Sequence, residues 1–336
     1  MARTSKRELA ARALGWSGFG AALRRLGAWH GLLVLAYHRI GDGSYAETDR
    51  GVWSASAEAF AAQLRYLKQS TDVITTADIA DVLRRPRGRF ALITFDDGYR
   101  DNYEVAFPIL RAERLTALFF VTTGFLDDRR PAWWDEIAWM IRHSPRTGLL
   151  ASPWLPEGIR FDEPGREQAI GKALRLYKSL PGNKTADFLD HLAEATRSGR
   201  CPRSISESLW MTWDMVRAMQ SAGMSLGGHT VNHPVLARLN PEEQQAEIDG
   251  CAARLRAELN TSMRWFSYPN GKRGCFNDDT RDVLRQRGVE FGFSYYGGVQ
   301  RLGRFDELDI PRFGVDGDLT LDAFRAALAL PKVFAR

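Results

Sequence analysis

Two adjacent acids, Asp96 and Asp97, stand between an apolar run and a glycine in the segment TFDDGY, residues 94–99. Neighbouring side chains of a regular strand point to opposite faces, but a turn at Gly98 would let both carboxylates reach one site. Two acids in one site repel each other unless a cation or a proton separates their roles. The segment therefore predicts either a site built on two carboxylates or a solvated acidic turn in which an aspartate caps the next helix.

Two histidines four residues apart, His229 and His233, follow a β-rich run in the segment GGHTVNHP, residues 227–234. Side chains at this spacing lie on one side of a helical turn, so both imidazoles can bind one metal ion. Chance surface histidines are the alternative interpretation.

One aspartate and two histidines would form a three-ligand site for a divalent metal, with one coordination position open, as in hydrolytic zinc sites. The same ligand set can hold Fe(II) for oxygen chemistry. The second aspartate favours hydrolysis, because that reaction needs a base for the water that the metal activates.

A third segment, FSYPNG at residues 266–271, predicts a strand that ends in a proline–glycine turn. Such a turn can direct backbone N–H groups at a developing oxyanion. By itself the segment is equally compatible with a plain loop.

Together these segments resemble the polysaccharide deacetylase family, which is the fourth family of carbohydrate esterases and is also called NodB-like. The first family motif, T-F/Y-D-D, matches residues 94–97, and the second, H-S/T-x-x-H, matches residues 229–233. The third, R-x-P-Y/F, aligns with residues 267–270, where the arginine is missing and the final aromatic residue is an asparagine. The resemblance extends over residues 32–315.

The resemblance implies a role for each matching residue. Asp97, His229 and His233 would bind the metal, usually zinc, with cobalt or nickel as other possibilities. Asp96 would act as the general base. The backbone N–H of Asn270 would contribute to an oxyanion hole.

The missing arginine leaves open how Asp96 is oriented and kept ionised. Arg312, in the segment DIPR, is our candidate for the missing guanidinium and for a contact with the substrate. Tyr268 and Tyr99 are further candidates for substrate contacts. Tyr99, Trp133 and Trp134 either stack on sugar faces or pack in the core or in a lid.

The family's fifth motif, leucine-x-histidine near the C-terminus, is absent, and no histidine follows His233. Instead the chain carries the segment LAYHR at residues 35–39. This resembles the branch of the family whose barrel is circularly permuted, in which an N-terminal Tyr-His pair supplies the general acid. His38 is therefore the candidate acid, and a buried structural histidine is the alternative.

The elements that must position these residues are short β-rich runs alternating with longer helical patterns. Several runs are continuously apolar, as is typical of strands covered on both faces in a parallel sheet. Residues 31–336 are therefore expected to form an irregular (β/α) barrel of about seven to eight strands. The candidate strands are 32–38, 72–75, 90–95, 117–122, 225–228, 264–268, 290–295 and 308–315, and clear helical patterns cover 57–69, 241–259 and 277–287.

Residues 127–210 interrupt the alternation, since they contain helical patterns at 167–180 and 184–196 but no convincing strand. We expect a helical insertion between two barrel strands. Insertions at this end of a barrel form lids or substrate walls, although a structural buttress is an equal alternative.

The net charge of +5 comes from residues 1–25, which hold six basic residues and one acid. Since the remainder of the chain is neutral, a general nucleic-acid-binding surface is not expected. Residues 1–30 form a basic, amphipathic arm that either contacts an anionic membrane or packs as an ordinary helix. Three cysteines without metal-type spacing favour a reducing compartment. The expected location is the cytoplasm or the inner membrane surface.

The sequence thus predicts a metal-dependent hydrolase that removes an N-acetyl group from an amino sugar in a polysaccharide, an oligosaccharide or a sugar conjugate. Hydrolysis of another amide (a formamide, imide or ureide) and a non-catalytic glycan-binding homologue remain alternatives. A glycosidase is disfavoured, because its two carboxyls must lie about 5 Å or more apart on either side of the scissile bond.

Overall fold

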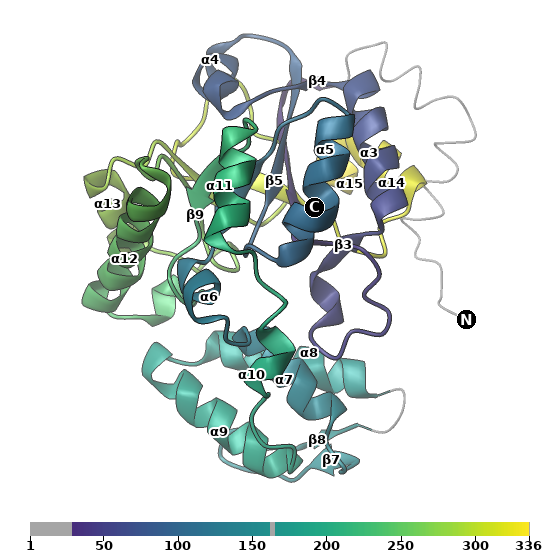
Figure 1. The fold of residues 1–336 in the computed structure, drawn as a ribbon, viewed down its shortest axis with the longest axis vertical. Coiled ribbons are helices and arrows are strands. Elements are labelled where there is room, and N and C mark those ends of the chain that lie inside the picture. Colours follow the sequence, from purple (N-terminus) through teal and green to yellow (C-terminus); the bar gives the residue numbers. More distant parts are fainter. Residues whose placement is uncertain (1–28, 162–164, 336) are drawn as a thin grey trace.

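The computed structural model describes residues 29–161 and 165–335 (Figure 1). The predicted basic arm, residues 1–30, lies almost entirely outside the described residues, and its membrane contact stays a prediction. Within the described ranges, no helix is long and apolar enough to cross a membrane.

Seven parallel strands form a closed ring. In ring order they are β1 (Gly31–Tyr37), β12 (Ile310–Gly314), β11 (Phe291–Ser294), β10 (Trp265–Ser267), β9 (Ser225–Gly228), β6 (Leu118–Val121) and β5 (Arg89–Phe95), which pairs again with β1. An eighth strand, β4 (Asp72–Val73), pairs with the start of β5 beside the ring. The predicted irregular barrel of seven to eight strands is confirmed, and every predicted strand is present with ends that differ by no more than two residues.

Both faces of the barrel strands are covered, which explains their continuous apolar sequence. In β1, Leu33 and Leu35 belong to the apolar cluster between the strands and the surrounding helices. Leu32 and Val34 belong to a second cluster, which fills the barrel lumen. The two-residue period of a strand produces this division, and the whole of β1 is buried as a result.

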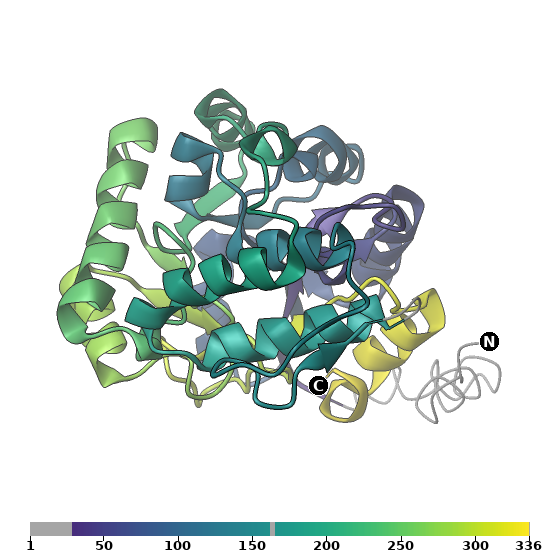
Figure 2. The ribbon, with the colours of Figure 1, turned by 90° about the horizontal axis from the view of Figure 1, so that it is seen from below.

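Helices surround the ring (Figures 1 and 2). The long ones are α3 (Ala57–Ser70), α11 (Trp213–Ser221), α12 (Pro241–Leu259), α13 (Asp278–Gln286) and α14 (Leu321–Ala329). The short ones are α4 (Ile79–Arg84), α5 (Phe107–Ala112), α6 (Thr123–Asp128) and α15 (Pro331–Phe334). The predicted helices at 57–69, 241–259 and 277–287 correspond to α3, α12 and α13 within one residue.

The start of α12 shows how the sequence defines a helix boundary. The Asn240 side chain accepts a hydrogen bond from the backbone N–H of Glu243, and the Glu243 side chain accepts one from the backbone N–H of Asn240. Pro241 occupies the first helical position, where its missing N–H costs nothing. This reciprocal cap places the helix beside the loop that follows β9.

Between β6 and β9 the chain forms the helical insertion, drawn in the lower part of Figure 1. It contains α7 (Trp133–Arg142), α8 (Arg166–Ser179), α9 (Thr185–Thr196) and α10 (Arg203–Ser206). The insertion has an apolar core of its own, in which Phe161, Phe188 and Leu192 are completely buried.

Two pairs of short strands are not predicted by the sequence. They are β2 (Arg39–Ile40) with β3 (Trp53–Ala55), and β7 (Gly148–Leu149) with β8 (Ile159–Arg160) inside the insertion. The expectation that the insertion holds no strand is therefore wrong. Runs of two or three residues are too short to show the alternation by which strands are recognised.

The separate core of the insertion yields a stability prediction. Leu192→Ala should lower the free energy of unfolding by about 2–5 kcal/mol, because it removes buried methyl groups and leaves a cavity. Leu150→Ala, in the same insertion but at a side chain that is 80% exposed, is the control and should change it by less than about 0.5 kcal/mol. Urea unfolding of both variants measures the difference, and equal effects would contradict a packed core around Leu192.

Candidate active site

Alternate residues of the barrel strands point into the lumen, and this row continues beyond the carboxyl end of each strand. In β1 the row runs from Leu32 and Val34 to His38, and in β5 it runs from Leu92 to Asp96. The same period of two directs further polar side chains to this end of the lumen. They are His229 after β9, Ser267 in β10, Tyr295 after β11 and Arg312 in β12.

The turn after β5 brings Asp97 to the same end of the barrel lumen as Asp96. The N–H of Gly98 donates to the carbonyl oxygen of Asp96 at 3.0 Å, which closes a tight turn around Asp97. Asp97 has a φ of +75°, a left-handed conformation that is unfavourable for an aspartate. The strain is consistent with a functional position, because it directs both carboxylates into one cavity.

The two histidines lie on an irregular loop, so the predicted helical turn between them is wrong. Thr230 and His233 have φ values of +65° and +57°, which no right-handed helix contains. The N–H of His233 donates to the Thr230 hydroxyl at 2.9 Å. Glu247 of α12 accepts hydrogen bonds from two backbone N–H groups of the loop, at 2.9 and 2.8 Å. These contacts, and not a helix, bring the imidazoles together.

Asp97, His229 and His233 form a compact, buried set of possible metal ligands. One ligand atom from each lies within 4.8 Å of the other two. The Asp97 Oδ1 atom is 3.4 Å from His229 Nε2 and 3.5 Å from His233 Nε2. This oxygen is buried without a hydrogen-bond partner among the described residues. A carboxylate and two imidazoles in this arrangement fit a divalent ion such as zinc.

The surroundings of His229 and His233 shift the pKa values of the two imidazoles in opposite directions. The His229 Nδ1 atom is 2.7 Å from the Ser267 carbonyl oxygen, which assigns the proton to Nδ1 and leaves Nε2 free. Burial lowers the pKa of His229, but Asp96 and Asp97 outweigh burial and raise it, so protons and a cation would compete for Nε2. Burial, followed by the charge of His229, lowers the pKa of His233 to about 3, and this ring is neutral.

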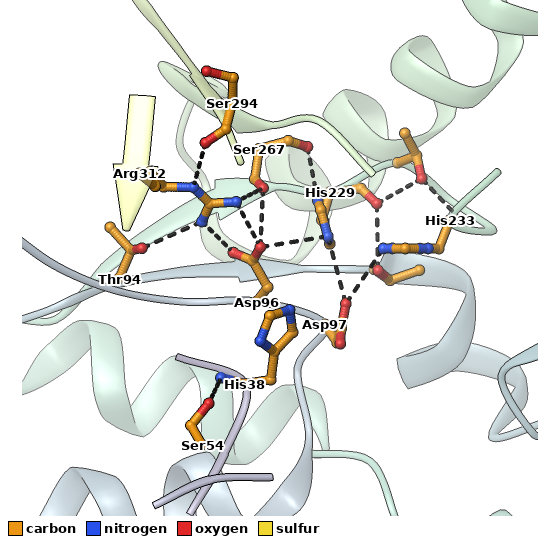
Figure 3. Close-up of polar contacts among 12 residues, drawn as sticks. His38, Ser54, Thr94, Asp96, Asp97, His229, His233, Ser267, Ser294 and Arg312 are labelled. Carbon is orange, nitrogen blue, oxygen red and sulfur yellow. Dashed lines mark hydrogen bonds and ion pairs between the residues drawn. The ribbon is translucent and has the colours of Figure 1, made fainter. Parts of the chain in front are cut away.

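Asp96 forms a buried, two-pronged ion pair with Arg312 (Figure 3). Arg312 Nη1 and Nη2 lie 2.7 Å from Asp96 Oδ1 and Oδ2, respectively. Arg312 Nη2 also donates to the hydroxyl of Ser267 at 2.8 Å, and Arg312 Nε donates to the carbonyl oxygen of Ser294 at 3.2 Å. Burial raises the pKa of Asp96, but Arg312 outweighs it and holds this pKa well below its usual range. Asp96 is therefore ionised at neutral pH.

The guanidinium thus comes from β12, while Ser267 occupies the position at which the family motif has its arginine. Ser267 contributes to the same contact, since its hydroxyl lies 3.2 Å from Asp96 Oδ2. The structure brings Arg312 to the partner that the sequence analysis suggested for it.

His38 lies beside the two aspartates, at the end of β1 (Figure 3). Its backbone N–H donates to the Ser54 hydroxyl at 2.9 Å, and its ring lies edge-on to Tyr295 with 5.8 Å between centroids. Asp316, which follows β12, lines the same cavity. Burial raises the pKa of Asp316, and the nearby His38 opposes this rise. The sequence analysis missed Asp316, although its position just after a barrel strand was a usable signal.

These residues line a cavity of about 500 Å³. Strand ends form its floor, and α8 of the insertion forms one wall with Ile170, Leu174 and Lys178. Of the lid, wall and buttress considered for the insertion, the structure shows a cavity wall. Trp133 and Trp134 of α7 also border the cavity, and the Trp134 ring lies edge-on to His233 at 4.5 Å.

Three further candidates differ in their access to the cavity. Asn270 lines it with a φ of +58°, and no hydrogen bond of its backbone N–H is found within the described ranges. Tyr268 borders the cavity, but its ring stacks on Phe276 and its hydroxyl donates to the carbonyl oxygen of Leu308.

The prediction that Tyr99 contacts the substrate is wrong, because its side chain is completely buried away from the cavity. Its hydroxyl donates to Asp135 Oδ2 at 2.9 Å, and its ring stacks on Trp210. The left-handed residue Asp97 interrupts the strand alternation, so the side chain two positions later leaves the lumen. Tyr99 therefore joins the barrel to the insertion and does not contact a ligand in the cavity.

Comparisons with known proteins agree with this architecture. The family model described as Polysaccharide deacetylase matches residues 84–145 and 169–292. YxkH of Bacillus subtilis (strain 168), whose name assigns it provisionally to the polysaccharide deacetylases, is 21% identical over 265 residues. That match covers 78% of this chain and 63% of YxkH, so the chain spans less than two thirds of this relative.

Two solved structures share the fold. The deacetylase PplD of Streptococcus pyogenes, in complex with acetate, superposes with a TM-score of 0.57 at 18% identity, covering 86% of this chain and 94% of PplD. IcaB of Ammonifex degensii gives a TM-score of 0.57 at 22% identity, covering 90% of this chain and 98% of IcaB. At such identities the likeness concerns the fold alone.

The ion pair between Asp96 and Arg312 yields a prediction on stability and pH. Arg312→Met should lower the free energy of unfolding by about 3–5 kcal/mol at neutral pH, since it leaves a buried carboxylate without its partner. The loss should shrink as the pH falls towards about 4, for two reasons. First, the unpaired carboxyl of the variant, whose pKa is raised by burial, takes up a proton and is no longer a buried charge. Second, the ion pair stabilises the wild type less, because a lowered carboxyl pKa adds to the free energy of unfolding only while the unfolded chain is ionised.

Urea unfolding at a series of pH values tests this expectation. Arg264→Met is the matched control, because Arg264 also forms a two-pronged pair, with Glu290, but at the surface. It should cost less than about 1 kcal/mol at any pH. Equal losses in the two variants would show that burial of the Asp96 pair does not matter.

Proposed function

The chain belongs to the polysaccharide deacetylase family, and from this premise we propose that it is a metal-dependent hydrolase that removes an N-acetyl group from an amino sugar. One observation carries the proposal: a buried set of metal-type ligands lies directly beside an ionised carboxylate in a cavity. Asp96 Oδ2 is 3.8 Å from the Nε2 atom of the ligand His229. Amide hydrolysis needs these two functions next to each other, because water must be both activated and deprotonated.

Asp97, His229 and His233 would hold the divalent ion, for which zinc is the simplest choice and cobalt or nickel are alternatives. When bound, such an ion polarises the amide carbonyl and lowers the pKa of a water molecule.

Asp96 would accept the proton of the attacking water on a carboxylate oxygen. Its depressed pKa keeps it ionised, and Arg312 fixes the plane of its carboxylate through two hydrogen bonds. Asp96 Oδ2 also accepts a hydrogen bond from the Ser267 hydroxyl, whereas Oδ1 accepts only from Arg312 among the described residues and retains a second lone pair for the proton. Arg312 therefore acts through Asp96 as a positioning residue and need not contact the substrate.

Asn270 and His38 would serve the later part of the reaction. The backbone N–H of Asn270, for which the described part of the chain offers no hydrogen-bond partner, can donate to the oxyanion that develops on the acetyl carbonyl. An amine leaves only when it is protonated, and the His38 imidazole can supply this proton from beside the two aspartates.

Two substitutions test the division of labour between the acids. Asp96→Asn should retain bound zinc but lose about 10²–10⁴ in kcat, because it removes the base and leaves the three metal ligands in place. It should also be less stable than the wild type, since Arg312 loses its buried counter-ion. Asp97→Asn should bind zinc more weakly as well, because it removes a ligand. Titration calorimetry with zinc and release of acetate from N-acetylglucosamine oligomers measure the two effects. Equal zinc loss in both variants would overturn the assignment.

The same assay also decides the chemistry of the substrate. Release of acetate, formate and ammonia is measured across N-acetylated sugars, formamides, imides and ureides, with and without a chelator. Acetate release that stops with chelator and returns with zinc is the expected result. Full activity in a metal-free preparation would refute metal dependence.

His38→Ala tests the proposed acid. The variant should retain zinc and lose most N-deacetylation, because the amine can no longer leave with a proton. It should largely retain hydrolysis of an aryl acetate, whose leaving group departs without protonation. Equal losses on both substrates would assign His38 a structural role in place of a catalytic one.

A further inference from the structure

Two lysines from different elements line the cavity in addition to the catalytic groups. Lys178 lies in the last turn of α8, and Lys272 lies in the loop between β10 and α13. Lys178 Nζ lies 5.6 Å from the centre of the Trp133 ring, which is part of the cavity border. Neither lysine forms an ion pair with a carboxylate of the described residues.

The carboxylates around the cavity are mostly occupied by other partners. Asp96 is paired with Arg312 and Asp97 lies between the two histidines. Glu167 of α8 is paired with Arg142 at 2.5 Å and with Arg50 at 3.3 Å. Asp49 accepts a hydrogen bond from the N–H of Gly51, and Asp316 lies near His38. These two carboxylates also interact with the charges of Lys178 and Lys272, respectively, but form no ion pair with them.

The two ammonium groups act on each other. Desolvation, and then the charge of Lys272, lower the pKa of Lys178. Two like charges that share a cavity repel each other until an anion lies between them.

We propose that the substrate carries an oxyanion, a phosphate or a carboxylate, close to its N-acetyl group and that Lys178 and Lys272 bind this group. This inference rests on the proposed function and specifies its substrate class. Lysine ammonium groups bind phosphate and carboxylate oxygens as point charges with several donors. A neutral N-acetylated oligosaccharide would leave both ammonium groups without a direct ion pair and would be the poorer substrate.

The test compares neutral and anionic substrates on the zinc-loaded full chain. The probes are N-acetylglucosamine, N-acetylglucosamine 1-phosphate and a disaccharide of glucuronic acid and N-acetylglucosamine. At least one anionic probe should exceed the neutral one by about 10-fold or more in kcat/KM, as charge-assisted hydrogen bonds provide. Lys178→Ala and Lys272→Ala should each reduce this preference, mainly through a higher KM for the anionic probe.

Two neighbouring cations are matched controls. Lys172 lies on the same helix as Lys178 and Arg273 follows Lys272, and neither of them lines the cavity. Lys172→Ala and Arg273→Ala should retain the full preference. If the controls lose as much as the lysine variants, general surface charge explains the effect and the proposal is wrong.

The remaining outcomes separate this inference from the proposed function. Preference for the phosphate or for the disaccharide identifies the source of the oxyanion, and both results support the proposal. Equal kcat/KM for neutral and anionic probes overturns it while the deacetylase function stands. If no probe is hydrolysed, calorimetric binding decides: tighter binding of an anionic probe that is lost in Lys178→Ala supports the lysine site even though the proposed reaction has failed.

Discussion

The ion pair between Asp96 and Arg312 is the interaction on which the carboxyl end of the barrel depends. Both side chains are almost completely buried, and an isolated charge at either position would be severely destabilising. The pair is tolerable because the guanidinium and carboxylate meet in parallel and Ser267 satisfies a further donor. The same contact connects β5 with β12, which are both neighbours of β1. The contact that orients the Asp96 carboxylate therefore also helps to close the ring.

Most of the fold follows from the local sequence, because continuous apolar runs of four to seven residues identify strands that are covered on both faces. The ring order does not follow in the same way. It depends on pairings such as β1 with β12, which join residues far apart in the chain, and no local pattern encodes them. The strand alternation nevertheless predicts part of the site, since the inward-facing residues of β1 and β5 continue to His38 and Asp96.

The candidate site likewise contains residues that local sequence identifies and residues that only the tertiary structure identifies. The motif residues are recognisable because their chemistry and spacing are local. Glu247, Asp316 and Lys178 were missed because their relevance arises only when α12, the end of β12 and α8 reach the cavity. The remaining errors come from left-handed backbone conformations at residues that are not glycine. Asp97 turns the Tyr99 side chain away from the lumen, and His233 lies in an irregular loop where a helical turn was expected.

The position of β12 also matters for how the molecule is made. The ribosome synthesises β5 early and β12 last among the ring strands, so Asp96 exists long before its counter-ion. A nascent chain that lacks Arg312 cannot bury this carboxylate without a large penalty, and the β1 edge facing β12 has no partner yet. The insertion, whose core comes almost entirely from residues 125–210, has no such requirement. During translation the insertion can therefore fold first, and the barrel around the catalytic cavity is completed only when the last strand arrives.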